Sequence, residues 1–363
     1  MRWSPITPAR VSRVGGALPR PCILRTQPGR RPRYRPSHVA AEEASVRSPP
    51  EGQPVVEERG GTARSRLRAP VGAASERACW ACGGRTVAPH QYGPLALSLC
   101  RSCGLLFDLD RSEAELRSLY TDDYFFDSDR GAPLVDDEAA RRYEARLRVD
   151  WVRTYRQTGD LLEIGSGGGY FLSEAQAATE LAVCGVEPAE HIAAASASRF
   201  SVDVATGFVE QVALAADSYD LVCAWHVLEH LATPARALGR IHGALRDGGF
   251  LFVEVPNVAG VTATAQGAAW PPLDPRHHVA HYGPRSLRAL LERSGFEVLE
   301  LLSFPSSRYY SARQVLWPGM WPTLARQGWA LRWPPRRAHP WKQDLLRAVA
   351  RADGGDAPMP RQR

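Results

Sequence analysis

Lysine is almost absent from this chain, because Lys342 is the only lysine among 45 basic residues in a sequence of 363 residues. We interpret this scarcity as codon bias of a GC-rich genome rather than as a use of arginine chemistry. Long apolar runs are also missing, since no segment approaches the roughly 18 residues of a membrane-spanning helix. We therefore expect no transmembrane segment. A secretory signal is missing as well, and we expect a cytoplasmic protein.

A net positive charge is confined to the N-terminal part of the chain. Residues 1–75 hold 14 Arg and 5 Glu, a net charge of +9, so the remaining 31 basic and 34 acidic residues sum to −3. A mildly acidic body lacks the basic surface that counters a phosphate backbone. We therefore find no strong nucleic-acid signal.

Composition divides the chain into five parts. Residues 1–75 are rich in Arg, Pro, Gly, Ala and Ser without an apolar period, and we predict a disordered extension. A targeting segment or a start codon placed too early are the alternatives for this part. Residues 76–108 form a cysteine unit, residues 109–158 a polar helical linker or lid, residues 159–303 a domain of alternating strands and helices, and residues 304–363 a Trp/Arg/Pro-rich segment.

Strands and helices alternate along residues 159–303, which predicts an α/β, doubly wound and mostly parallel sheet covered on both faces. Trp151 and Tyr155 before it are candidate packing anchors. We predict strands at 161–164, 182–187, 202–205, 219–225, 249–255 and 296–303, and helices at 169–178, 189–199, 234–246 and 285–294.

The C-terminal segment holds half of the ten tryptophans, at Trp317, Trp321, Trp329, Trp333 and Trp341. Aromatic residues mixed with arginine could make a peripheral contact with a membrane surface or with a partner protein. Packing of this segment over the sheet domain, with disorder after about residue 352, is the alternative that we favour. The oligomeric state is not indicated by the sequence.

A glycine-rich turn follows the strand at 161–164. Gly165, Gly167 and Gly169 give the spacing G-x-G-x-G, whereas a dinucleotide fingerprint would need its third glycine where this chain has Tyr170. Glu163 precedes the turn by two residues, and its carboxylate suits an ammonium group better than a pyrophosphate. Glu187 ends the next strand, where an acid can accept hydrogen bonds from both ribose hydroxyls.

These residues resemble motif I of the class I S-adenosylmethionine-dependent methyltransferases. The run Tyr219–His230, with its His-Val-Leu-Glu-His ending, and the later Val255-Pro256-Asn257 also resemble that family in order and spacing. The resemblance covers about residues 159–303. It implies that His226 and His230 flank the methionine end of the cofactor, that Trp225 also binds the cofactor, and that Phe208 lines the pocket of the adenine base. The family adds a final antiparallel strand, for which residues 304–363 offer no clear candidate.

Two C-x-x-C pairs, Cys79/Cys82 and Cys100/Cys103, have the spacing of a four-thiolate zinc site. Gly83 and Gly104 follow each pair, where the backbone must turn. Four thiolates leave no open position, which makes this zinc structural, and two disulfides are the alternative. We expect no other bound metal. A zinc ribbon ahead of such a domain resembles the zinc-ribbon sugar C-methyltransferases, although their catalytic Tyr-His pair is absent here.

His277, His278 and His281 cluster after the fifth strand, near the expected position of the transferred methyl group. Imidazole is the natural base for an acceptor hydroxyl or acidic carbon, so we predict His281 or His278 as catalytic. Trp270 in the same region could stack on a ring-shaped substrate. The leading hypothesis is methyl transfer to oxygen or carbon of a sugar, polyketide-like or lipid-linked small molecule. A zinc-ribbon RNA methyltransferase and a non-catalytic scaffold protein are the alternatives.

Overall fold

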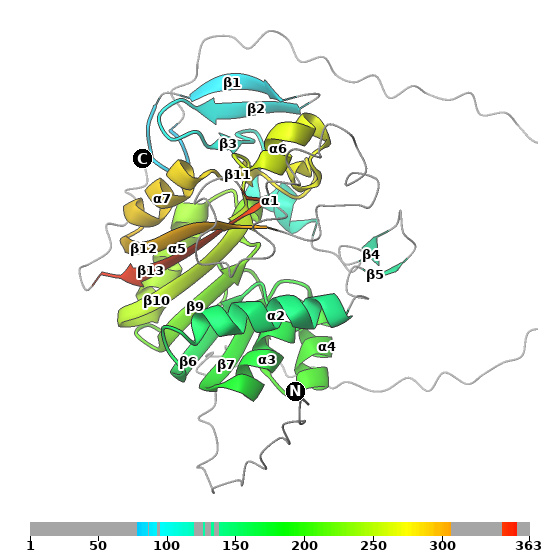
Figure 1. Ribbon diagram of the computed structural model, residues 1–363, viewed down its shortest axis with the longest axis vertical. Coiled ribbons are helices and arrows are strands. Elements are labelled where there is room, and N and C mark those ends of the chain that lie inside the picture. Colours follow the sequence, from blue (N-terminus) through cyan, green and yellow to red (C-terminus); the bar gives the residue numbers. More distant parts are fainter. Residues whose placement is uncertain are drawn as a thin grey trace, which may run out of the picture.

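The computed structural model describes residues 78–85, 87–92, 95–119, 126–127, 132–133, 138–305 and 343–353. The predicted extension over residues 1–75 and the five tryptophans of the C-terminal segment lie outside these ranges. A small sheet lies beside a larger one, and helices pack against the larger sheet (Figure 1).

The larger sheet has seven strands in the spatial order β12-β13-β10-β9-β6-β7-β8. Five of these strands run parallel to their neighbours within the group, as predicted: β6 (Thr158–Ile164), which leads into the glycine-rich turn, and the later β7 (Glu180–Glu187), β8 (Asp203–Thr206), β9 (Tyr219–Trp225) and β10 (Leu245–Pro256). The strand order reverses between β6 and β9. In open α/β sheets, ligands bind at the carboxyl ends of the strands beside such a reversal.

The C-terminal segment contains a strand that we did not predict. β13 (Leu345–Ala352) lies between β10 and β12 (Phe296–Phe304) and runs antiparallel to both. Both of its faces are buried, so the period-two alternation of a half-buried strand is lost, and its three alanines favour a helix by propensity. Pairing with two neighbours overrides that propensity, and the expectation of no candidate strand in residues 304–363 is wrong.

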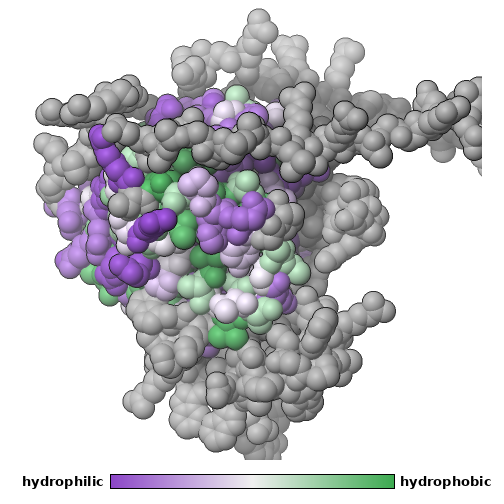
Figure 2. Space-filling view, turned by 90° about the horizontal axis from the view of Figure 1, so that it is seen from above, coloured by the Kyte–Doolittle hydropathy of each residue, from purple (hydrophilic) through white to green (hydrophobic). Residues whose placement is uncertain are grey.

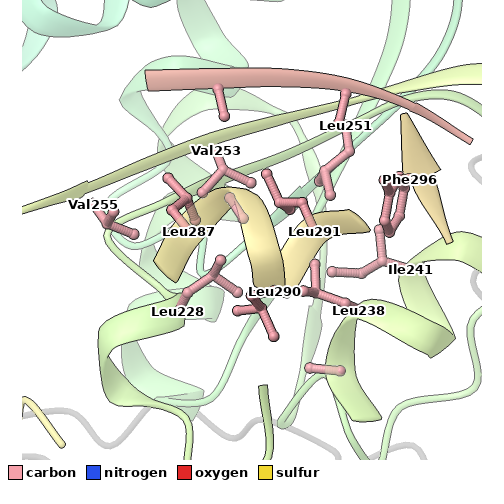
Figure 3. Close-up of a cluster of buried hydrophobic side chains, with 14 of the residues drawn as sticks. Leu228, Leu238, Ile241, Leu251, Val253, Val255, Leu287, Leu290, Leu291 and Phe296 are labelled. Atoms are coloured by element: carbon pink, nitrogen blue, oxygen red, sulfur yellow. The ribbon is translucent and has the colours of Figure 1, made fainter. Parts of the chain in front are cut away.

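Helices cover both faces of the larger sheet. On one face, α5 (Pro234–Ala244) and α7 (Pro284–Arg293) bury their apolar sides against β10. Figure 3 shows this cluster, in which leucines of both helices surround Leu251 and Val253. Phe252 points to the opposite face, because successive side chains of a strand alternate.

The opposite face is covered by α2 (Glu138–Val152) and α3 (Tyr170–Ala178), while α4 (Glu190–Phe200) packs against β7 and β8. Trp151 at the end of α2 meets Phe252 edge to face with ring centroids 5.0 Å apart, and Tyr155 meets the same ring at 5.3 Å. Both residues are packing anchors, as predicted. They fix the C-terminal end of α2 on the sheet.

The small sheet joins two distant parts of the sequence. β1 (Val87–Tyr92), β2 (Leu95–Cys100) and β3 (Leu106–Phe107) come from the cysteine region, and the fourth strand is β11 (Ala280–His281). Ala280 pairs with Phe107 and His281 with Leu106. The histidine-containing loop before α7 is therefore part of the same sheet as the cysteine region.

Short elements complete the described parts of the chain: α1 (Glu113–Arg117), β4 (Phe126–Asp127), β5 (Ala132–Pro133), η2 (Leu228–His230), α6 (Val261–Gln266), η3 (Gly267–Ala269) and η4 (Pro271–Leu273). Within the residues that can be described, no helix combines the length and the apolar character needed to cross a bilayer. The face seen from the side of β1 and β2 mixes hydrophilic and hydrophobic residues (Figure 2).

Candidate functional site

The glycine-rich turn adopts backbone conformations that favour glycine. Gly165, Gly167 and Gly169 have φ angles of +68°, +50° and +76°. A Cβ at Gly165 would lie 2.8 Å from Val227, and one at Gly169 would lie 2.9 Å from Ser196. A Cβ at Gly167 would meet no described atom within 4 Å. The turn thus packs tightly at its ends and leaves open space at its centre.

Glu163 lies directly before this turn and is 3% exposed. Its Oε2 has no hydrogen-bond partner among the described residues. Burial raises the pKa of this carboxyl well above its usual value, Arg148 opposes the shift, and Glu187 adds to it. A buried carboxylate oxygen without a partner is unfavourable, and the α-ammonium group of S-adenosylmethionine would satisfy it. The site therefore fits that cofactor.

Glu187 is buried at the end of β7 and holds the turn in place. Its Oε2 accepts a hydrogen bond from the backbone N–H of Gly167 at 2.8 Å, and its Oε1 accepts one from Ala189 at 3.0 Å. A carboxylate has about four acceptor positions, so two remain for ribose hydroxyls. The ribose assignment stays a prediction, and the contact with Gly167 adds a structural role that the sequence did not reveal.

Phe208, predicted to lie at the adenine, and Trp225, also predicted to bind the cofactor, occupy different environments. Phe208 is half-buried beneath the Arg117 guanidinium, which lies 5.4 Å from the ring centroid. Trp225 is 5% exposed, its indole N–H has no partner among the described residues, and Phe171 meets it edge to face. The guanidinium carbon of Arg148 lies 5.3 Å from the Trp225 ring centroid. The roles of Phe208 and Trp225 toward the cofactor stay predictions.

His226 belongs to a buried charge network that the sequence analysis missed. Its Nε2 lies 3.2 Å from Glu254 and its Nδ1 lies 3.1 Å from Glu229. Glu254 is 1% exposed and also accepts hydrogen bonds from Arg148 of α2 and Arg347 of β13. Burial opposes protonation of His226, but its hydrogen bonds to Glu229 and Glu254 outweigh burial and raise its pKa to about 9. At neutral pH, His226 is therefore a cation and unsuited to accept a proton.

The network members come from α2, β9–η2, β10 and β13, which no local pattern connects. Arg148 stands among several arginines on a polar helix, and Arg347 lies on the strand that was not predicted. Only the pairing of β13 with β10, in which Arg347 is the partner of Glu254, brings the two side chains together. The network could have been predicted from the sequence only if the order of the strands in the sheet had been known.

The histidine loop brings His278 against His230 of η2. The rings of His230 and His278 meet edge to face with centroids 4.6 Å apart. His281 is 4% exposed on β11, and burial together with His278 lowers its pKa to about 3. The catalytic assignments of His278 and His281 are not decided by this geometry. They stay predictions.

Trp270 does not fit its expected role. The residue is 2% exposed and belongs to a small core cluster with Ala263 and Leu273, against which Tyr92 and Leu95 of the cysteine region pack. It joins the loop after β10 to the β1–β2 hairpin. The prediction that its ring stacks on a substrate is therefore wrong.

The four predicted metal ligands converge. The sulfur atoms of Cys79, Cys82, Cys100 and Cys103 all lie within 4.8 Å of one another. Gly83 and Gly104 have φ angles of +71° and +79°, which confirms the predicted turns after each pair. The backbone N–H of Gly84 lies 3.4 Å from the sulfur of Cys82, to which it donates. This arrangement is consistent with a zinc ribbon.

Comparisons with known proteins find matches among methyltransferases. Residues 137–301 match a family described as a methyltransferase domain. A ubiquinone biosynthesis O-methyltransferase of Rhizobium etli is 30% identical over 151 residues, covering 39% of this chain and 60% of that protein. A probable S-adenosylmethionine-dependent methyltransferase of Mycolicibacterium smegmatis is 32% identical over 144 residues, covering 39% of this chain and 54% of that protein.

The chain thus spans less than two thirds of the length of these curated relatives. Among solved structures, an S-adenosylmethionine-dependent methyltransferase from Thermotoga maritima covers 59% of this chain and 91% of its own, at 18% identity and a TM-score of 0.44. The sheet order and the glycine-rich turn agree with the family match, and residues 137–301 form a methyltransferase domain with a Rossmann-like fold.

Proposed function

We propose that this protein transfers the methyl group of S-adenosylmethionine to an oxygen or carbon nucleophile of a small-molecule acceptor. The observation that carries the proposal is the unpartnered, buried carboxylate oxygen of Glu163 beside the open centre of the glycine turn. A cationic amino acid end fits this carboxylate, and the space at Gly167 lets a ligand approach the backbone. The name of the Rhizobium etli relative, an O-methyltransferase of ubiquinone biosynthesis, favours an oxygen atom of a small molecule as the acceptor.

Methyl transfer from a sulfonium needs alignment of the nucleophile and, for a hydroxyl, a base. Of the two predicted bases, His278 suits this task better. His281 has a pKa lowered to about 3, and so weak a base removes a hydroxyl proton poorly. Nδ1 of His278 lies 2.7 Å from the carbonyl oxygen of Pro272, which can only accept a hydrogen bond. Nδ1 therefore carries the proton, and Nε2 is the nitrogen with the lone pair.

The function is tested with the full chain, labelled S-adenosylmethionine and a cell extract separated into small-molecule, RNA and protein fractions. We expect label in a small molecule. Glu187→Ala should raise the cofactor Kd at least about tenfold, because a buried carboxylate acceptor is lost, and should reduce labelling accordingly. Glu190→Ala, an exposed acid on the adjoining helix, serves as the matched control. Label in RNA alone, or cofactor binding without any labelled product, would contradict the proposal.

A structural zinc at Cys79, Cys82, Cys100 and Cys103 supports the acceptor side of the site. Structural zinc contributes about 10–16 kcal/mol of apparent binding free energy at pH 7 to a small domain that lacks a large core. The cysteine region and the histidine loop share backbone hydrogen bonds, among them Asp108 N–H to Val279 O at 2.9 Å. Order in the ribbon therefore supports order in the loop that holds His278 and His281.

Removal of the zinc with a chelator should loosen the small sheet while sparing the cofactor site. We expect faster amide hydrogen exchange in residues 106–108 and 279–281, since these residues pair with one another. Exchange in β6 should stay slow, and S-adenosylmethionine affinity should be unchanged. Equal exchange of both regions before and after chelation would show that the ribbon needs no metal.

A further inference from the structure

Three side chains outside the cysteine cluster approach one another closely enough to share an ion. One ligand atom each of Glu229, His230 and His278 lies within 4.8 Å of the others. Glu229 and His230 belong to η2 after β9, whereas His278 belongs to the loop before β11. The loop is held against η2 by a hydrogen bond from Val279 N–H to Glu229 O at 2.8 Å.

Both imidazoles are oriented by backbone carbonyl groups. Nδ1 of His230 lies 3.1 Å from the carbonyl oxygen of His277, and Nδ1 of His278 lies 2.7 Å from that of Pro272. Because a carbonyl oxygen only accepts, Nδ1 is the protonated nitrogen in each ring and Nε2 carries the lone pair. Metal-ligating histidines are typically oriented in this way, with the other ring N–H on a carbonyl or carboxylate.

Glu229 supplies an independent sign of a missing partner. The residue is 1% exposed, and its Oε1 lies 3.1 Å from Nδ1 of His226. Its Oε2 is buried and has no hydrogen-bond partner among the described residues. Leaving a carboxylate oxygen without water and without a donor is unfavourable, and a cation beside it would remove that cost.

We propose that Glu229, His230 and His278 bind a divalent first-row transition-metal ion such as Zn²⁺, Mn²⁺ or Fe²⁺. Two imidazoles and one carboxylate suit these ions, whereas Mg²⁺ and Ca²⁺ prefer oxygen ligands throughout. Three protein ligands leave coordination positions open, in contrast to the closed four-thiolate site of the ribbon. This proposal departs from our expectation that the chain binds no metal beyond the ribbon.

The ion would also specify how the acceptor is activated. An acceptor hydroxyl that occupies an open position would release its proton to water more easily, because a bound cation stabilises the resulting oxyanion. The oxyanion would then take the methyl group as the methyl–sulfur bond of S-adenosylmethionine breaks, which leaves S-adenosylhomocysteine. His278 then acts as a ligand instead of a free base. This role rests on the proposed methyl transfer, whereas metal binding itself does not.

The test uses the full chain with zinc already bound in the ribbon. Co²⁺ is titrated into this protein by calorimetry, and metal content is then measured by mass spectrometry after desalting. We expect about one further equivalent per chain, with a visible spectrum that lacks thiolate charge transfer, because the proposed ligands contain no sulfur. Failure to take up a second equivalent at millimolar Co²⁺ would overturn the proposal, even if methyl transfer is observed.

Variants locate the site. His278→Ala and Glu229→Gln should each weaken Co²⁺ binding at least about tenfold, as losses of metal partners do. His277→Ala is the matched control, because it lies one residue away and its side chain pairs with Asp274 outside the three proposed ligands. S-adenosylmethionine binding by each variant checks folding. Should Glu229→Gln fail to fold, His278→Ala remains decisive. Equal Co²⁺ affinity in His278→Ala and the unaltered protein would overturn the assignment, as would equal loss in His277→Ala.

Discussion

Truncation of the chain after Gln343 should abolish folding, although it removes only the last 20 residues. β13 is hydrogen-bonded to β10 on one side and to β12 on the other. Leu346, Ala348 and Val349 are fully buried within it. Its loss would expose two strand edges and the apolar surface on both faces of the sheet, and would leave Glu254 without Arg347. The combined cost should exceed the roughly 5–15 kcal/mol that stabilises a typical domain.

The measurement compares soluble yield and cooperative thermal unfolding of two truncated chains. Truncation after Asp353 is the matched control, because it retains every residue of β13. We expect the longer chain to unfold cooperatively and to bind S-adenosylmethionine, and the shorter chain to aggregate. A shorter chain that melts cooperatively at the same temperature would show that β13 contributes little to the sheet.

Glu163→Gln should weaken S-adenosylmethionine binding by about 2–4 kcal/mol, or roughly 30- to 800-fold, because a buried charge pair loses one partner. The substitution keeps the size of the side chain and removes its negative charge. Methylthioadenosine has the nucleoside and thioether but lacks the ammonium group, so its affinity should be unchanged. Calorimetric titration of both ligands separates loss of the charge pair from damage to the turn. Equal losses for the two ligands would refute the ammonium assignment.

The same substitution should stabilise the cofactor-free protein at higher pH. Burial raises the pKa of Glu163 in the folded state, so between its unfolded pKa of about 4.3 and the raised folded value the folded protein holds a proton that the unfolded chain has lost. The stability contributed by Glu163 is present below pH 4.3 and falls as the pH rises. Glu163→Gln lacks this loss. Its melting temperature relative to the unaltered protein should therefore be higher at pH 8 than at pH 5.

The sequence predicted the parts of the fold that depend on local pattern. Glycines with spacing two, an acid before them and apolar strand runs identify β6, its turn and α3, because each residue there serves a local backbone requirement. The two cysteine pairs were found for the same reason. Strand ends and helix bounds differ from the prediction by a few residues.

Features that depend on contacts across the sheet were not predictable. The partners of Glu254 lie on α2 and β13, and no spacing links Arg148 to Arg347. The proximity of His278 to His230 arises from the pairing of Val279 with Glu229. Trp270 was assigned to a substrate because the contact of its loop with the β1–β2 hairpin could not be foreseen.

The position of β13 has a consequence for the order in which the molecule is made. During synthesis, β10 and β12 leave the ribosome before β13, because β13 comes later in the sequence. In the finished sheet β13 separates these two strands, since Phe250 of β10 and Glu297 of β12 both pair with Arg351. Contacts over such long stretches of chain form slowly, and open strand edges invite association with other chains. The nascent domain therefore passes through a period in which its sheet is incomplete in the middle, and dependence on chaperones should be greatest until the residues of β13 emerge.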